Sequence, residues 1–198
     1  AVTQPAASTD YAMRIVLKRN GLEPDKDVRI LYAQDINGVL TSVSAGNAGA
    51  GIISAPTSIR AKAAGLRAIV DVTALKVPFL FTAMLSSAKV IREKNEAVTR
   101  FLRGYIESLA VIRKDKETTM RSMGKFLKTT DQAVLESVYD DYKDVFPTTP
   151  LMTAAEVKAV LDVAKSPKAK QMKPEEFFDN SIVQKIQASG FIEQVNKH

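Results

Sequence analysis

The sequence predicts an α/β protein in two parts, with one complete βαβ lobe over residues 1–75 and a helix-rich part over residues 76–198. In the first part, short β-type runs alternate with amphipathic stretches that end at glycine, as in βαβ units on a parallel sheet. In the second part, apolar residues recur every three or four positions, which is the period of a helix with one buried face.

In the first part, each β-type run precedes residues that favour the start of a helix. The pattern begins at Val2-Thr3, and the segment Ser8–Asp10 offers cap candidates for a helix that ends near Gly21. The same alternation then repeats, and it predicts four strands and three helices. The later elements are strands at 28–32, 49–54 and 66–72, a helix that begins at Gln34-Asp35, and a helix over 57–64.

In the second part, one more β-like run over 79–85 precedes residues that read almost wholly as helix. Helices are expected over 117–126, 131–145, 154–164 and 181–189, with a capping box at 153–156. Before them, one long stretch carries a stripe that we expect to be buried. It comprises Val98, Phe101, Leu102, Tyr105, Ile106, Leu109 and Ile112.

These helices need a surface to cover, because an apolar stripe must pack against another element. They could form a bundle among themselves, or they could cover a sheet whose strands lie before residue 1. We expect the second arrangement. Residues 1–75 would then be an inserted second lobe, and residues 71–79 the crossover that returns the chain to the first lobe.

The composition argues against nucleic acid as a partner. Lys and Arg number 28 and Asp and Glu 22, a difference of +6, but the charges are scattered. The densest basic stretch, Lys165–Lys173, has no aromatic residue on which bases could stack, so we interpret it as a solvated loop. No apolar run approaches the roughly 20 residues of a membrane-spanning helix.

The sequence also lacks the residues of a catalytic or metal site. There is no cysteine, and the one histidine is His198, the last residue, so thiol and histidine-dependent mechanisms are excluded. Adjacent acids such as Glu175-Glu176 do not face one site on a helix, and no Gly-rich phosphate loop occurs. We therefore predict a binder rather than an enzyme, with no catalytic residue, cofactor or metal.

The candidate ligand site lies in three loops, because ligands of such sheets bind at the carboxyl ends of the strands. The hydroxyls of Ser8 and Thr9, with the amides at a helix start, suit a sulfonate, carboxylate or phosphate, although either hydroxyl could instead cap the helix. In the second loop, Asp35 could bind a ligand or cap a helix; in the third, Thr57 is the expected cap. The candidate site residues are Ser8, Thr9, Asp10, Tyr11, Gln34, Asp35, Ser54 and Pro56.

Several segments, in their order and spacing, carry a family resemblance. They are residues 2–11, 20–28, 53–56, 177–181 and 189–192. Through them the chain resembles the sulfonate, taurine and nitrate type solute-binding proteins of ABC importers, which include binders of thiamine pyrimidine precursors. The resemblance implies a type II periplasmic-binding-protein fold, of which this chain lacks most of the first lobe.

The resemblance also implies a function, in which a small organic ligand is captured between two lobes and delivered to an ABC permease. The basic excess and the Ser8-Thr9 loop favour an anion, but Asp10 and Asp35 would equally suit an amine or a neutral heterocycle. The location would be periplasmic or extracytoplasmic, although this chain shows no signal peptide. Two alternatives share the fold: the effector-sensing domain of a transcription regulator and an enzyme of thiamine pyrimidine synthesis, against which the lack of an internal histidine counts. Because apolar helix faces would be uncovered, we also expect self-association of the chain.

Overall fold

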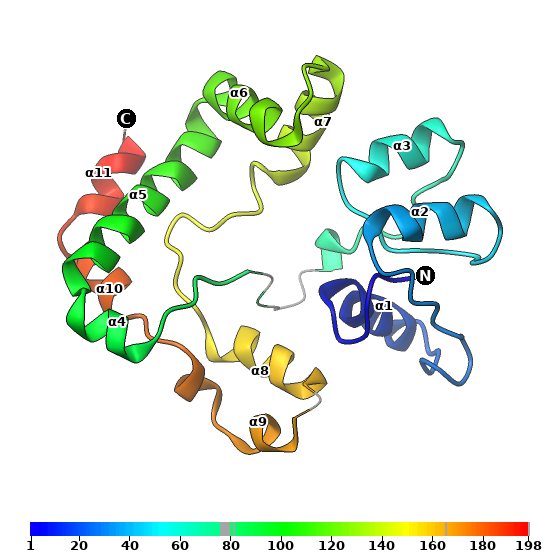
Figure 1. Cartoon of the computed structure of the whole chain (residues 1–198), viewed down its shortest axis with the longest axis horizontal. Coiled ribbons are helices and arrows are strands. Elements are labelled where there is room, and N and C mark those ends of the chain that lie inside the picture. The colour runs from blue at the N-terminus through cyan, green and yellow to red at the C-terminus, as the bar shows by residue number, and fades with distance from the viewer. Residues whose placement is uncertain (76–79, 81, 165, 198) are drawn as a thin grey trace. The chain divides into compact units, whose positions relative to one another are not determined.

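The computed structural model describes residues 1–75, 80, 82–164 and 166–197, and it is mainly helical (Figure 1). Of the residues in the structure, 59% are in helices and 2% in strands, and the described residues contain no sheet. The prediction of an α/β fold of the type II periplasmic-binding class, with a complete βαβ lobe and a helix-rich part of a second lobe, is therefore wrong.

The chain divides into two compact units. Unit 1 comprises Ala1–Phe79 and Ala159–Gln171, and unit 2 comprises Leu80–Lys158 and Met172–His198. In unit 1 the helices are α1 (Ser8–Arg19), α2 (Ile36–Ser44), α3 (Thr57–Ala63), the 3-10 helix η1 (Thr73–Leu75) and α9 (Pro167–Gln171). In unit 2 they are α4 (Ala88–Glu93), α5 (Asn95–Lys114), α6 (Lys116–Leu127), α7 (Gln132–Tyr142), η2 (Pro174–Phe177), α10 (Ser181–Ala188) and α11 (Phe191–Lys197), and α8 (Ala154–Val163) belongs partly to each unit.

The predicted strands do not form a sheet because too little covers them. One parallel bridge joins Val2 to Tyr32, and the predicted strand over 66–72 leaves Ile69 78% exposed. Parallel strands are stable when both of their faces are buried, which these segments do not achieve. Of the predicted strand over 79–85, residues 79 and 81 lie outside the described residues, and the others are not in a strand.

The sequence signals of helix ends were more reliable than the strand patterns. Gly21, with φ +73°, follows the end of α1, and the capping box is confirmed by hydrogen bonds between Thr153 and Glu156. The basic stretch that we interpreted as a loop instead contains α9 within the described residues.

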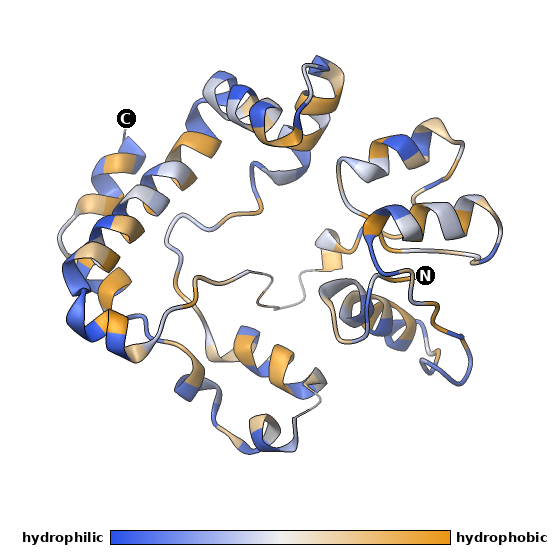
Figure 2. Cartoon of the chain, in the orientation of Figure 1, coloured by the Kyte–Doolittle hydropathy of each residue, from blue (hydrophilic) through white to orange (hydrophobic). Residues whose placement is uncertain are grey.

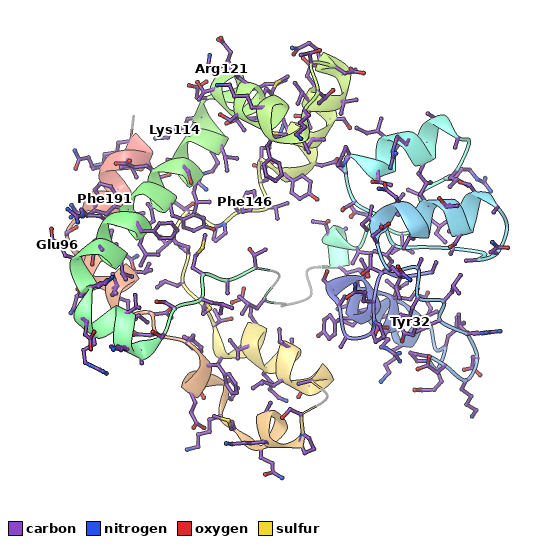
Figure 3. The ribbon with its side chains drawn as sticks, in the orientation of Figure 1. Tyr32, Glu96, Lys114, Arg121, Phe146 and Phe191 are labelled. Carbon is purple, nitrogen blue, oxygen red and sulfur yellow. The ribbon has the colours of Figure 1, made fainter. Side chains whose placement is uncertain are left out.

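The main core of unit 2 surrounds α5. Ile106 is fully buried and packs with Ile182, Ile186 and Ile192 of α10 and α11. Figure 3 shows Phe191 beside α5, where its ring lies 4.8 Å from the guanidinium carbon of Arg103. These contacts fix one face of the long helix.

Phe101 does not belong to this core, although the predicted stripe included it. Its side chain is 58% exposed. Five residues separate it from Ile106, which corresponds to about 140° around the helix axis, so the two side chains leave α5 in different directions. In Figure 2, apolar and polar residues alternate along α5.

A second cluster joins α6 to α7 through Met120, Leu135 and Tyr139. The side chains of Asp115 and Asp131 cap the two helices by accepting backbone hydrogen bonds in the first turn. The pair is therefore held by apolar packing and by defined helix starts.

The coil between α7 and α8 is tied to unit 2 at two points. Arg113 donates to the carbonyl oxygens of Phe146 and Pro147, each at 3.4 Å (Phe146 is labelled in Figure 3). Asn180 forms two hydrogen bonds with the backbone of Met152, at 3.1 and 2.9 Å. These bonds satisfy backbone groups that no helix pairs.

Asp179, just before α10, makes the stability of unit 2 depend on pH in the acid range. Its pKa lies below the ordinary 3.8 because its carboxylate accepts hydrogen bonds from the Ser181 side chain and backbone. A lowered folded-state pKa means that the stabilisation is complete above 3.8 and disappears as the pH falls through the lowered value. In Asp179→Asn, the free energy of unfolding should therefore be lower than that of the parent at pH 6 and should converge with it at the lowest pH. Urea unfolding measures both values. A carboxyl carbon resonance of Asp179 that titrates at 3.8 or above would contradict this.

Candidate functional site

Two extended segments of unit 1, residues 1–3 and 31–34, run parallel to each other. The amide of Val2 donates to the carbonyl oxygen of Leu31 at 2.9 Å, and the amide of Ala33 donates to that of Val2 at 2.8 Å. Because both segments run in the same direction, the loops that follow them emerge at the same edge.

A third segment, residues 50–52, lies on the other side of residue 1. The amide of Ile52 donates to the carbonyl oxygen of Ala1 at 3.2 Å, and the Ala1 amino group donates to the carbonyl oxygen of Ala50. A Cβ at Gly51 would lie 2.6 Å from a methyl group of Val39, so the absence of a side chain lets α2 approach. The three segments are parallel, and α1, α2 and α3 begin beyond the same edge, which we call the unit 1 edge.

The start of α1 has no side-chain cap among the described contacts. Its N-cap residue is Ala7, so the prediction that Ser8, Thr9 or Asp10 caps this helix is wrong. The Thr9 hydroxyl instead accepts from the Thr3 amide at 3.0 Å and shares a 2.8 Å hydrogen bond with the Thr3 hydroxyl. Thr9 thus ties α1 to the first segment, and Ser8 lies half-buried at the helix start.

Asp10 has a structural position. It is 4% exposed, and its carboxylate accepts from the amide of Ala6 at 2.8 Å and from Nε of Arg14 at 2.9 Å. Arg14 also donates to Asp25 at 2.7 Å and to the hydroxyl of Tyr32, labelled in Figure 3, at 3.2 Å. The hydrogen bond to Asp25 is the main cause of the raised pKa of Arg14. Asp10 therefore holds the first loop on α1.

Tyr11, the next residue, is half-buried in unit 1. Burial and, secondarily, the negative charge of Asp162 in α8 raise the pKa of its phenol. A phenol with the ordinary pKa of 10.0 is already protonated at neutral pH, and the shift moves the pKa of Tyr11 further above neutrality.

The second loop contains Gln34 and Asp35. Gln34 has φ +69°, and its amide donates to the carbonyl oxygen of Thr3 at 2.8 Å, which joins the first two loops. Asp35 caps α2 by accepting from the amide of Gly38 at 2.8 Å. A Cβ at Gly38 would lie 2.1 Å from the carbonyl oxygen of Ala33, so only glycine fits.

The third loop carries Ser54 and Pro56, both exposed. The carbonyl of Ser54 accepts from the amide of Ser58, and Pro56 follows a cis peptide bond and is the N-cap residue of α3. Thr57, which we expected to be the cap, is the first helical residue and is buried. The Ser54 side chain remains accessible at the unit 1 edge.

Sequence reasoning missed Arg60 and Asn37. The guanidinium of Arg60 donates to the amide oxygen of Asn37, which connects the first turn of α3 to that of α2. This places a positive charge next to the unit 1 edge. The two residues are far apart in sequence and follow no motif, so only the packing of α2 on α3 brings them together.

An open groove in unit 2 is lined by residues of α6, α7 and the turn between them, and by none of the predicted site residues. Two pairs of opposite charge lie in it: Lys116 lies 4.0 Å from Glu136, and Arg121, labelled in Figure 3, lies 3.8 Å from Glu117. Lys125 and Lys128 also line the groove. Its floor includes Met120, which is part of the α6–α7 core. The lining of the groove therefore has more basic than acidic side chains, and it lies apart from the loops that carry the predicted site residues.

Comparison with known proteins returned no matching family model, no matching curated protein and no matching solved structure. Within the described part of the chain, no three acidic, histidine or cysteine residues gather as metal ligands would. No described helix has the length and apolar character needed to cross a membrane.

Proposed function

We propose that the chain captures a small organic anion at the unit 1 edge, as the solute-binding component of an ABC importer. The observation that carries this is that three parallel segments end at one edge, beyond which follow the loops that contain Ser8, Asp35 and Ser54. Capture for delivery to a permease, outside the cytoplasm, is the role that the sequence resemblance implies.

Three features of the unit 1 edge favour an anion. Arg60 supplies a positive charge, and the start of α1 has no side-chain cap. The two acids of the site are already engaged, because Asp10 accepts from Ala6 and Arg14 and Asp35 accepts from Gly38. Their charge therefore opposes an incoming anion less than two free carboxylates would.

The hydroxyls at this edge favour binding over catalysis. Nucleophilic catalysis by a hydroxyl needs a neighbouring general base. The partner of the Thr9 hydroxyl is another hydroxyl, that of Thr3, and Ser54 is on an exposed turn. These groups can donate hydrogen bonds to an anion, but their surroundings do not activate them.

Replacing Arg60 with methionine should weaken the binding of such an anion at least about tenfold, because a charge-assisted hydrogen bond is lost. The measurement is a titration of the full chain, followed by amide chemical shifts, with ethanesulfonate, taurine, nitrate and succinate as probes. We expect at least one probe to shift the amides of Ser8, Thr9 and Asp35 together.

The matched control is Lys62→Met on the same helix. It removes the same charge two residues further on, which lies on another side of α3. Binding should change less than about twofold in this variant. Equal weakening by the two substitutions, or the failure of all four probes to shift the unit 1 edge, would overturn the proposed function.

A further inference from the structure

The face of α5 opposite the unit 2 core carries no charge over four turns. Its residues are spaced by four, three, four and three positions, which is the spacing of a coiled-coil seam. All five are exposed, including Phe101 at 58% and Val111 at 38%. We call this surface the α5 seam, and it consists of Ala97, Phe101, Gly104, Ser108 and Val111.

The α5 seam combines a protrusion with a depression. Phe101 forms the protrusion, because its side chain is 58% exposed. One turn away, a Cβ built on Gly104 would meet no atom within 4 Å, so the space above the helix backbone is open. A surface that carries both shapes can fit a second copy of itself, as an interface with two-fold symmetry requires.

An antiparallel pair of α5 helices matches large residues with small ones. When Gly104 lies opposite Gly104 of a second copy, Phe101 faces Ser108, and Ala97 faces Val111. The two outer kinds of layer each place a larger side chain against a smaller one, and the central layer contains only glycine, so the two helix backbones can approach closely there. The paired stretch from residue 97 to residue 111 is about 21 Å long.

Charges beside the α5 seam favour the same orientation. Arg100 and Glu107 lie seven residues apart on one flank, so in the antiparallel pair Arg100 of each copy faces Glu107 of the other. In a parallel pair, Arg100 would instead face Tyr105. The pair that Arg100 makes within the chain is weak, because it lies 3.5 Å from Glu96 with the two side chains 73% and 85% exposed.

We propose that two copies of this chain associate through antiparallel pairing of the α5 seam. Glu96 and Lys114 mark the two ends of α5 in Figure 3. The occupant is a second copy because shape and charge are complementary within the seam itself. This interface involves only unit 2 residues and does not depend on ligand binding at the unit 1 edge.

Sedimentation equilibrium of the full chain at low salt tests the pairing. We expect a reversible, concentration-dependent dimer whose dissociation constant rises at least about tenfold in Phe101→Ser, because the substitution removes apolar contact from both copies. The matched control is Phe126→Ser, since Phe126 on α6 is 86% exposed but lies outside the α5 seam. This control should leave the dissociation constant unchanged.

A charge exchange tests the orientation without altering the core. Arg100→Glu and Glu107→Arg should each weaken the dimer, and the double variant should restore it because both cross-pairs are re-formed with opposite sign. A chain that stays monomeric up to its solubility limit would overturn the proposal. So would a dimer that tolerates Phe101→Ser, or a double variant no stronger than the single ones.

Discussion

Replacing Asp10 with alanine should destabilise unit 1 by roughly 2–4 kcal/mol, because it removes a buried acceptor from two donors. The carboxylate is 4% exposed and holds both the Ala6 amide and the Arg14 guanidinium. Without it, the amide of the first loop is left without its partner at a position where φ is +60°. The measurement is urea unfolding, followed by amide hydrogen exchange at α1.

Asp25→Ala is the comparison for this variant. Asp25 binds the same guanidinium, but its side chain is 58% exposed, and exposed ion pairs contribute less than about 1 kcal/mol. The two substitutions therefore separate the burial of the acceptor from the charge of Arg14. Equal losses in the two variants would show that Asp10 does not anchor the loop in the way its contacts indicate.

Replacing Ile106 with alanine should destabilise unit 2 by about 2–5 kcal/mol, because it opens a cavity where α5 meets α10 and α11. Ile106 is 0% exposed and packs against Ile182, Ile186 and Ile192. The amides of α10 and α11 should lose their hydrogen-exchange protection first, since both short helices depend on this contact.

A graded substitution provides the control for the cavity. Ile106→Val removes one methylene group and should cost about 1 kcal/mol. A loss that does not increase from valine to alanine would mean that the neighbouring side chains close the space, or that Ile106 is not at the centre of this core.

Local features could be predicted from the sequence, whereas the fold class could not. A glycine after a helix or a Thr-Glu capping box acts on neighbouring residues, so Gly21 and Thr153 could be interpreted without knowing the rest of the chain. A β-type run forms a strand only when another strand and a covering layer are present. Among the described residues, none forms a strand beside residues 66–72, and the apolar side chains of this segment remain largely exposed.

The candidate site was predictable as a set of loops but not as a set of contacts. Asp35 was weighed as a helix cap, and it does cap α2, but the pairing of Arg60 with Asn37 depends on how two helices pack. Phe101 shows the same limit, because spacings of three and four residues describe more than one face of a long helix. Burial and partner choice are properties of the assembled chain.

The close approach of the Ala33 carbonyl to Gly38 restricts how this protein could change by mutation. No single substitution at position 38 leaves the backbone where it is, since even a methyl group would overlap the oxygen atom. A tolerated change would have to coincide with another that moves residues 31–34, and those residues are bonded to the first segment through Val2 and Thr3. Variation at this one position is thereby tied to variation in two other stretches of the chain.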